Sequence, residues 1–179
     1  MFFVEEEFAN NIEVTKSKFI AHLCPYTDFE KVLNRLKNEH PKARHFVYAY
    51  RYLNEFDQIV ENASDDGEPK GTSGKPTLAV LAGNELINTA VITVRYFGGT
   101  LLGTGGLVRA YGDAVNAVVK VAKLKEYKKL FTKTLEVQYS DLSKTEYMLN
   151  NLGLTIVAKN FDLKVTLEVC GTKEQLELI

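Results

Sequence analysis

Residues 94 to 111 read Val-Arg-Tyr-Phe-Gly-Gly-Thr-Leu-Leu-Gly-Thr-Gly-Gly-Leu-Val-Arg-Ala-Tyr, and this stretch decides most of the fold. Its first residues complete the β-branched segment Asn88–Tyr96, which predicts a strand. Five glycines follow within Phe97–Gly106, and Leu107–Lys123 then repeats apolar residues at helical spacing. We therefore expect a strand, a glycine-rich loop and an amphipathic helix in direct succession.

The glycine-rich loop has features of an anion-binding site. Glycines let the backbone approach a ligand closely, and the following helix presents free N–H groups at the positive end of its dipole. Arg95 and Arg109 flank the loop with guanidinium groups suited to phosphate, although Arg109 could instead pair with Asp113. The run Gly103–Val108 fails G-x-G-x-x-G at its last position, and no P-loop ending is present. A tight turn in which the glycines serve close packing is an equally open interpretation.

A second loop, Asp65–Pro76, carries three carboxylates within four residues. Asp65, Asp66 and Glu68 could serve as acid, base or metal ligand, but their spacing does not match an EF-hand loop. The density of glycine, proline and hydroxyl residues by itself predicts a solvated turn. The loop is nevertheless long for a compact domain, and long loops are often functional.

Other patterns outline the rest of the N-terminal half. They predict a strand at Phe19–Tyr26, a helix at Asp28–Asn38, a strand at Phe46–Tyr52 and its hairpin partner at Gln58–Asn62. Thr27 and Glu30 have capping-box spacing at the start of the helix. The aromatic residues at alternate positions of the expected strand Phe46–Tyr52 could stack on RNA bases, although packing in the core is the simpler interpretation.

The C-terminal part is a compact alternation of elements. We place the boundary within Lys120–Lys129, which gives domains at 1–127 and 128–179. Strands are expected at Thr134–Tyr139, Leu154–Lys159 and Leu163–Cys170, with helices at Leu142–Leu152 and from Thr172 onward. This β-α-β-β-α order suggests a ferredoxin-like domain without its final strand. Because Ile179 would fall within the last helix, we expect this domain to be truncated.

Composition restricts the classes of function. The 179 residues are 45% hydrophobic and 25% charged with a net charge of −1, so RNA or DNA binding would need a local basic patch. Cys24 and Cys170 lie in apolar runs and predict two buried thiols in a reducing compartment. We see no metal-ligand spacing, secretory signal or membrane span. A cytoplasmic protein without metal or cofactor is expected.

The two loops together resemble those of the YigZ/IMPACT family. The matching residues are Lys16–Phe19, His45 with Tyr48–Arg51, Asp65–Pro69 with Gly71–Pro76, and the run Arg95–Tyr111. The resemblance implies a first domain with the ribosomal-protein-S5 domain-2-like fold, a mixed sheet with helices on one face. It implies a second, ferredoxin-like domain similar to the last domain of elongation factor G, here lacking its final strand.

The resemblance also implies a function. Eukaryotic relatives act in translational control by binding a regulator of a starvation-responsive kinase pathway, and nucleic-acid or ribosome binding is the usual inference for bacterial members. We therefore expect an α+β protein that regulates translation during stress by binding RNA, the ribosome or a translation-regulatory protein, without catalysis or membrane contact. An enzyme acting on a small phosphorylated or acidic ligand is the alternative. The expected binding residues are Lys16, Lys18, His45, Asp65, Asp66, Glu68, Lys70, Thr72, Ser73, Arg95, Gly98, Gly99, Thr100, Gly103, Gly105, Gly106 and Arg109.

Overall fold

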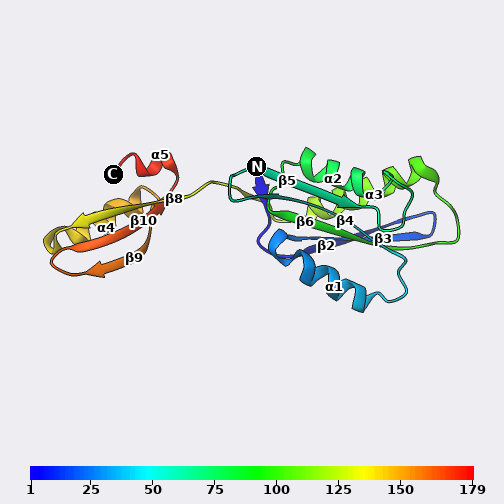
Figure 1. Cartoon of the computed structure of the whole chain (residues 1–179), viewed down its shortest axis with the longest axis horizontal. Coiled ribbons are helices and arrows are strands. Elements are labelled where there is room, and N and C mark those ends of the chain that lie inside the picture. Colours follow the sequence, from blue (N-terminus) through cyan, green and yellow to red (C-terminus); the bar gives the residue numbers. More distant parts are fainter. The chain divides into compact units, whose positions relative to one another are not determined.

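In the computed structural model, which describes all 179 residues, the chain divides into two units, Met1–Tyr127 and Lys128–Ile179. Each unit has its own hydrophobic core and contains both helices and strands (Figure 1). The predicted α+β fold class is confirmed.

The first unit is built on a five-stranded sheet in the order β2-β3-β6-β4-β5 (Figure 1). Its strands are β2 (Phe8–Val14), β3 (Ser17–Pro25), β4 (His45–Leu53), β5 (Ile59–Ser64) and β6 (Thr89–Tyr96). Strand β6 is central, and every residue from 89 to 95 is buried, as its β-branched sequence predicts. A short pair formed by β1 (Phe2–Phe3) and β7 (Lys125–Glu126) lies outside this sheet.

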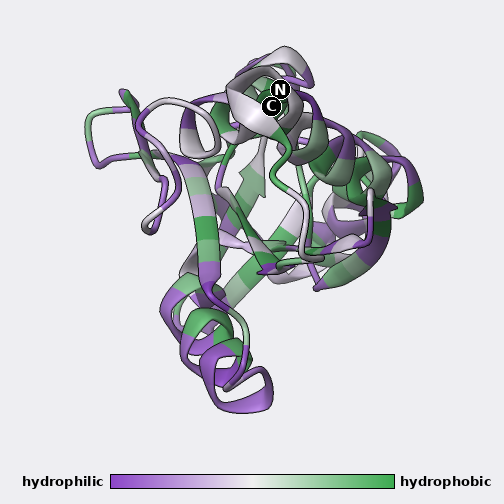
Figure 2. Ribbon diagram, turned by 90° about the vertical axis from the view of Figure 1, so that its right-hand side faces the viewer, coloured by the Kyte–Doolittle hydropathy of each residue, from purple (hydrophilic) through white to green (hydrophobic).

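Helices cover both faces of the sheet (Figure 1). Helix α1 (Phe29–Glu39) packs on one face, whereas α2 (Gly74–Gly83) and α3 (Gly103–Val121) pack on the other. The outer side of α1 is hydrophilic, while hydrophobic residues follow the strands (Figure 2). The aromatic residues of β4 pack beneath α1, where Phe29 contacts Tyr48 and Tyr50 at centroid distances of 4.9 and 5.1 Å. These rings therefore pack in a core and are not free to stack on RNA bases.

Three expectations for this unit are wrong. First, the resemblance implied a mixed sheet, but all four strand pairings are antiparallel. Second, it implied helices on one face only, but α1 covers the other face. The capping box at Thr27 does not form: a 3-10 turn at Tyr26–Asp28 precedes α1, whose N-cap, Asp28, makes no side-chain hydrogen bond to it.

Both glycine-rich loops are shorter than the sequence indicates. Helix α2 begins at Gly74, and its sequence Gly-Lys-Pro reads as a loop because proline is tolerated in a first helical turn. Helix α3 begins at Gly103, so three of the five loop glycines belong to its first turn. The loops proper span residues 65 to 73 and 97 to 102. They are called the acidic loop and the glycine loop below.

The second unit contains a three-stranded antiparallel sheet in the order β8-β10-β9. Its elements are β8 (Phe131–Val137), α4 (Leu142–Asn151), β9 (Thr155–Phe161), β10 (Val165–Gly171) and α5 (Lys173–Leu176). Alternate residues of β10 are buried with Leu149 and Leu176 of the two helices. This is the strand order of the corresponding part of a ferredoxin-like domain. Helix α5 begins with a capping box formed by Thr172 and Gln175 and ends at Leu176, so the expectation that Ile179 is helical is wrong.

Two further features bear on the sequence interpretation. Neither cysteine forms a disulfide: Cys24 is buried and Cys170 is partly exposed. Burial raises the pKa of the Cys24 thiol to about 12. No helix of the chain combines the length and apolar character needed to cross a bilayer.

Candidate binding site

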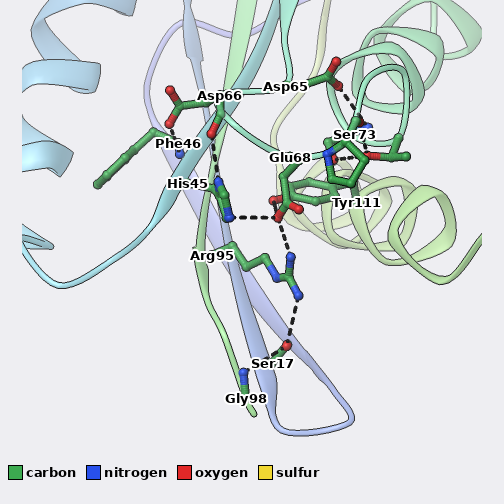
Figure 3. Close-up of polar contacts among 12 residues, drawn as sticks. Ser17, His45, Phe46, Asp65, Asp66, Glu68, Ser73, Arg95, Gly98 and Tyr111 are labelled. Atoms are coloured by element: carbon green, nitrogen blue, oxygen red, sulfur yellow. Dashed lines mark hydrogen bonds and ion pairs between the residues drawn. The ribbon is translucent and has the colours of Figure 1, made fainter. Parts of the chain in front are cut away.

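The register of the sheet places the first residues of the site next to each other. His45 on β4 lies opposite Arg95 on β6, and Arg95 in turn lies opposite Phe19 on β3. Because side chains alternate across a strand, Arg95 points to the face covered by α2 and α3. Tyr111 of α3 points toward Arg95 from the helices that cover this face (Figure 3).

Glu68 of the acidic loop is the centre of a buried polar network (Figure 3). Its Oε1 atom accepts a hydrogen bond from the Tyr111 hydroxyl at 2.8 Å and pairs with Arg95 Nη1. The same oxygen lies 3.6 Å from Nε2 of His45. The side chains of Glu68 and Arg95 are only 3% and 6% exposed, so this is a desolvated ion pair. One carboxylate oxygen thus joins the acidic loop to β4, β6 and α3.

Asp66 fixes the orientation of the His45 ring. The backbone carbonyl of Asp66 lies 2.8 Å from His45 Nδ1, and because a carbonyl can only accept, Nδ1 carries the proton. The Asp66 carboxylate accepts the backbone N–H of Phe46 at 2.7 Å. Asp66 therefore holds the acidic loop against the start of β4, and Nε2 of His45 faces Glu68.

Arg95 makes further contacts within the site. Its Nη2 donates to the Ser17 hydroxyl at 3.4 Å, and its guanidinium lies 5.4 Å from the Phe19 ring and 5.8 Å from the Phe97 ring. The buried Nε atom has no hydrogen-bond partner. Burial raises the pKa of Tyr111 far above its usual range, and the charge of Glu68 adds to the rise, so this hydroxyl stays protonated as a donor.

Asp65 organises the start of α2 instead of the polar network. Its carboxylate accepts backbone N–H groups of Gly71, Ser73 and Gly74 at 2.9, 3.2 and 2.8 Å. Burial alone would raise the pKa of Asp65, but these three donors outweigh it and hold the pKa below its usual range. The three carboxylates of the acidic loop thus point to different partners and form no cluster of metal-ligating side chains (Figure 3). Thr72 is buried at the same helix start, where its hydroxyl donates to the Pro69 carbonyl at 2.5 Å.

Gly98 of the glycine loop is required by close packing. A Cβ atom at this position would lie 2.1 Å from the backbone carbon of Lys16 and 2.3 Å from the nitrogen of Ser17. The Gly98 N–H donates to the Ser17 hydroxyl at 3.1 Å. Thr15 and Lys16 have φ angles of 48° and 67°, the geometry of a tight two-residue hairpin turn between β2 and β3. The glycine loop is therefore fixed against this turn.

A cavity of about 320 Å³ opens where the two loops meet the start of α3. It is lined by Arg44, His45, Glu68, Pro69, Arg95, Phe97, Leu101, Leu102, Gly103, Thr104 and Leu107. The exposed Arg44 lies 5.5 Å from the Phe97 ring centroid. No side chain caps the N-terminus of α3, whose first N–H groups therefore lack partners within the helix.

The cavity brings together only some of the residues expected from sequence. His45, Glu68, Arg95 and Gly103 line it. Arg95 lies buried under the cavity, not exposed beside the loop, and Arg109 is exposed on α3 without an ion pair to Asp113. The other expected residues do not line the cavity. Lys16, Lys18, Lys70, Gly99 and Thr100 are exposed, Gly105 and Gly106 belong to the first turn of α3, and Ser73 is buried at the start of α2.

The structure adds Ser17, Arg44 and Tyr111 to the site. Ser17 and Tyr111 lie within the stretches that carry the family resemblance, so the sequence did offer a reason to include them in the site. The sequence offered no reason to include Arg44, because nothing near it in the chain distinguishes it from an ordinary solvent-exposed arginine.

Together, the fold and the cavity describe a small α+β protein with a candidate ligand site between two loops and a helix N-terminus. Comparison with known proteins gives the family. The model of the Impact N-terminal domain matches residues 15–119. An IMPACT family member of Haemophilus influenzae is 36% identical over 168 residues, which are 91% of this chain and 80% of that protein. The IMPACT family member YigZ of Escherichia coli is 37% identical over 160 residues, 88% of this chain and 78% of that protein.

This chain belongs to the IMPACT family, as its two loops indicate. A solved crystal structure of a hypothetical protein agrees with its fold. That structure matches with a TM-score of 0.70 and 32% identity, covering 99% of this chain and 87% of the other.

Proposed function

We propose that this chain is a non-enzymatic, cytoplasmic regulator of translation that binds RNA at the cavity between the acidic loop and the glycine loop. Membership of the IMPACT family supports the role in translation. The observation that carries RNA binding is the meeting of an unpaired cation, Arg44, with the uncapped N-terminus of α3 at one cavity.

The charges of the site support an anionic ligand. Within the cavity, Glu68 is already neutralised by Arg95, whereas Arg44 makes no ion pair and lies over the Phe97 ring. The N-terminus of a long helix adds a partial positive charge and free N–H donors. The local balance at the mouth is therefore positive, although the whole chain has a net charge of −1.

Exposed lysines next to the two loops extend this surface. Lys16 lies in the turn that packs on Gly98, and Lys70 lies in the acidic loop. Neither is in an ion pair, so each can neutralise a phosphate without breaking a contact within the protein. Phosphate contacts of this kind position an RNA backbone without reading its sequence.

The test is binding of the full chain to ribosomal subunits and short RNAs across a salt series. We expect binding that weakens steeply with salt, and Lys16→Ala or Lys70→Ala should each lower the slope of log K against log salt by about one. Lys37→Ala is the matched control, because this exposed lysine lies on α1, at the opposite face of the sheet. Absence of binding at low salt, or equal effects of the control variant, would contradict the proposal.

One observation favours a second candidate, an enzyme acting on a small phosphorylated or acidic ligand. The imidazole of His45 is fixed by Asp66, lines the cavity and places Nε2 beside Glu68, an arrangement suited to proton transfer. Against it, Glu68 Oε1 is already shared by Arg95 and Tyr111. Product formation from a phosphorylated ligand, lost in His45→Ala while binding persists, would establish the enzyme.

A further inference from the structure

We propose that the cavity binds a single nucleotide through a terminal phosphate: a nucleoside 5′-monophosphate, either free or at the 5′ end of an RNA. This inference rests on the proposed function and names the ligand of the same site. It follows from the closed floor of the cavity, the donors at its mouth and the apolar side chains between them.

The floor allows a chain end but not a strand that passes through. The cavity ends on Glu68 and Arg95, whose side chains are 3% and 6% exposed and bonded to each other, with Tyr111 completely buried behind them. An internal RNA segment needs two exits, whereas a terminal or free nucleotide needs one. The volume of about 320 Å³ is at the small end of ligand sites.

The phosphate would lie at the start of α3. Gly103, with φ 73°, and Thr104 line the cavity there, and no side chain occupies the N-cap acceptor position. The Thr104 hydroxyl and the Arg44 guanidinium add donors beside the free backbone N–H groups. A terminal phosphate has three oxygens that can accept from such a set, while an internal phosphodiester has two and a carboxylate has two.

An orphaned donor points to a ligand independently of the helix. Arg95 Nε is buried within the cavity wall and has no hydrogen-bond partner, although the rest of its guanidinium is bonded to Glu68 and Ser17. Buried donors without partners are rare, because their desolvation is not compensated. A polar ligand that enters the cavity places acceptors next to this side chain.

The base would lie among the apolar side chains. Phe97, Leu102 and Leu107 line the cavity, and Leu101 at its mouth is 86% exposed, so a planar ligand would cover it. Glu68 uses Oε1 for all three of its contacts, which leaves Oε2 to accept from the base. We therefore expect bases with an exocyclic amino group, such as adenine, to bind better than uracil.

The experiment is calorimetric titration of the full chain with five probes: AMP, UMP, adenosine, and one short RNA sequence carrying either a 5′-phosphate or a 5′-hydroxyl. AMP should bind more tightly than UMP and at least tenfold more tightly than adenosine, because the phosphate supplies charge-assisted hydrogen bonds. The 5′-phosphorylated RNA should exceed the 5′-hydroxyl RNA by a similar factor and compete with AMP. Arg44→Ala should weaken AMP roughly ten- to a hundredfold.

Two variants separate loss of the site from loss of the fold. Thr104→Asp places a carboxylate where the phosphate would lie and should abolish AMP binding, while an acidic residue in a first helical turn favours the helix itself. Arg109→Ala is the matched control, since this exposed arginine lies on the same helix but outside the cavity lining. AMP affinity should be unchanged in that variant.

The outcomes are distinguishable from failure of the proposed function. Equal affinity for AMP and adenosine, or equal loss in Arg44→Ala and Arg109→Ala, overturns the nucleotide site even if RNA still binds elsewhere. AMP binding without RNA binding supports the site for a free nucleotide and contradicts the proposed function. A short peptide with a free carboxyl terminus, titrated as a sixth probe, should not bind. Binding of that peptide in place of AMP, abolished by Thr104→Asp, would assign the same donors to a protein partner and overturn the inference.

Discussion

Removing the Glu68 carboxylate should strongly destabilise the first unit, because it breaks a buried ion pair. Glu68→Ala leaves the Arg95 guanidinium buried at 6% exposure without its counter-ion. Breaking a buried pair by removing one partner costs about 3–5 kcal/mol. Because a whole domain is stabilised by only about 5–15 kcal/mol, this variant should approach the limit of folding. Arg95→Ala should cost a similar amount, since Glu68 would then be the unpaired charge.

Removing both charges should cost less than the two single changes together. In Glu68→Leu with Arg95→Met, no buried charge remains, and such replacements are often neutral or stabilising. The Tyr111 hydroxyl does lose its acceptor, at a cost of about 1–3 kcal/mol. We therefore expect the double variant to be more stable than either single variant.

Chemical denaturation of the full chain, followed by circular dichroism, measures these free energies. Hydrogen exchange at the amides of β6 assigns the transition to the first unit, because this strand is its central one. If either single variant lost less than about 1 kcal/mol, or if the two losses simply added, the description of a desolvated pair would be refuted.

Three further predictions concern neighbouring features. Gly98→Ala should destabilise the unit by about 3 kcal/mol or more, because the new Cβ meets the Lys16 backbone. Gly99→Ala is the matched control: its Cβ would enter open space, so it should cost only the strain of a φ of 88°, about 1–2 kcal/mol. Equal melting temperatures for the two variants would contradict this. Thr93→Val removes a buried hydroxyl without a partner and should be neutral or stabilising by about 1 kcal/mol in the same denaturation assay; a clear loss would indicate a missed partner. Since the pKa of Asp65 is lowered on folding, its contribution to stability is present above its unfolded pKa and is lost as pH falls through the folded value. Asp65→Asn should flatten this acidic limb of the stability–pH curve, and an unchanged limb would contradict the assignment.

The elements with local signals could be predicted from sequence. The β-branched run of β6 and the helical spacing after residue 107 depend on neighbours in the chain, and both predictions are close to the observed bounds. Strand β2 was not predicted because it is a half-buried edge strand that contains Asn10 and Asn11. Helix α2 was not predicted because its first turn reads as a loop and only Leu81 of its apolar residues is fully buried.

The site was predictable as a set of residue types but not as an arrangement. His45, Glu68 and Arg95 each stood out from the sequence, yet their pairing depends on strand register and on a separation of 27 residues between Glu68 and Arg95. That separation explains why both residues were expected to be binding groups and not partners of each other: an ion pair between distant residues has no local sequence signal. Arg44, which the structure leaves unpaired, had none either.

The central position of β6 has a consequence for synthesis of the chain on the ribosome. The hairpins β2–β3 and β4–β5 are each complete early, but they meet only through β6, which pairs with both β3 and β4. Domains generally fold as units during synthesis, and this one cannot close its sheet until residues 89 to 96 have emerged. Until then β3 and β4 each have an open edge, which is the hazard that unpaired strands present for aggregation. Nascent chains and fragments that end before residue 89 should therefore depend on chaperones in a way that the finished protein does not.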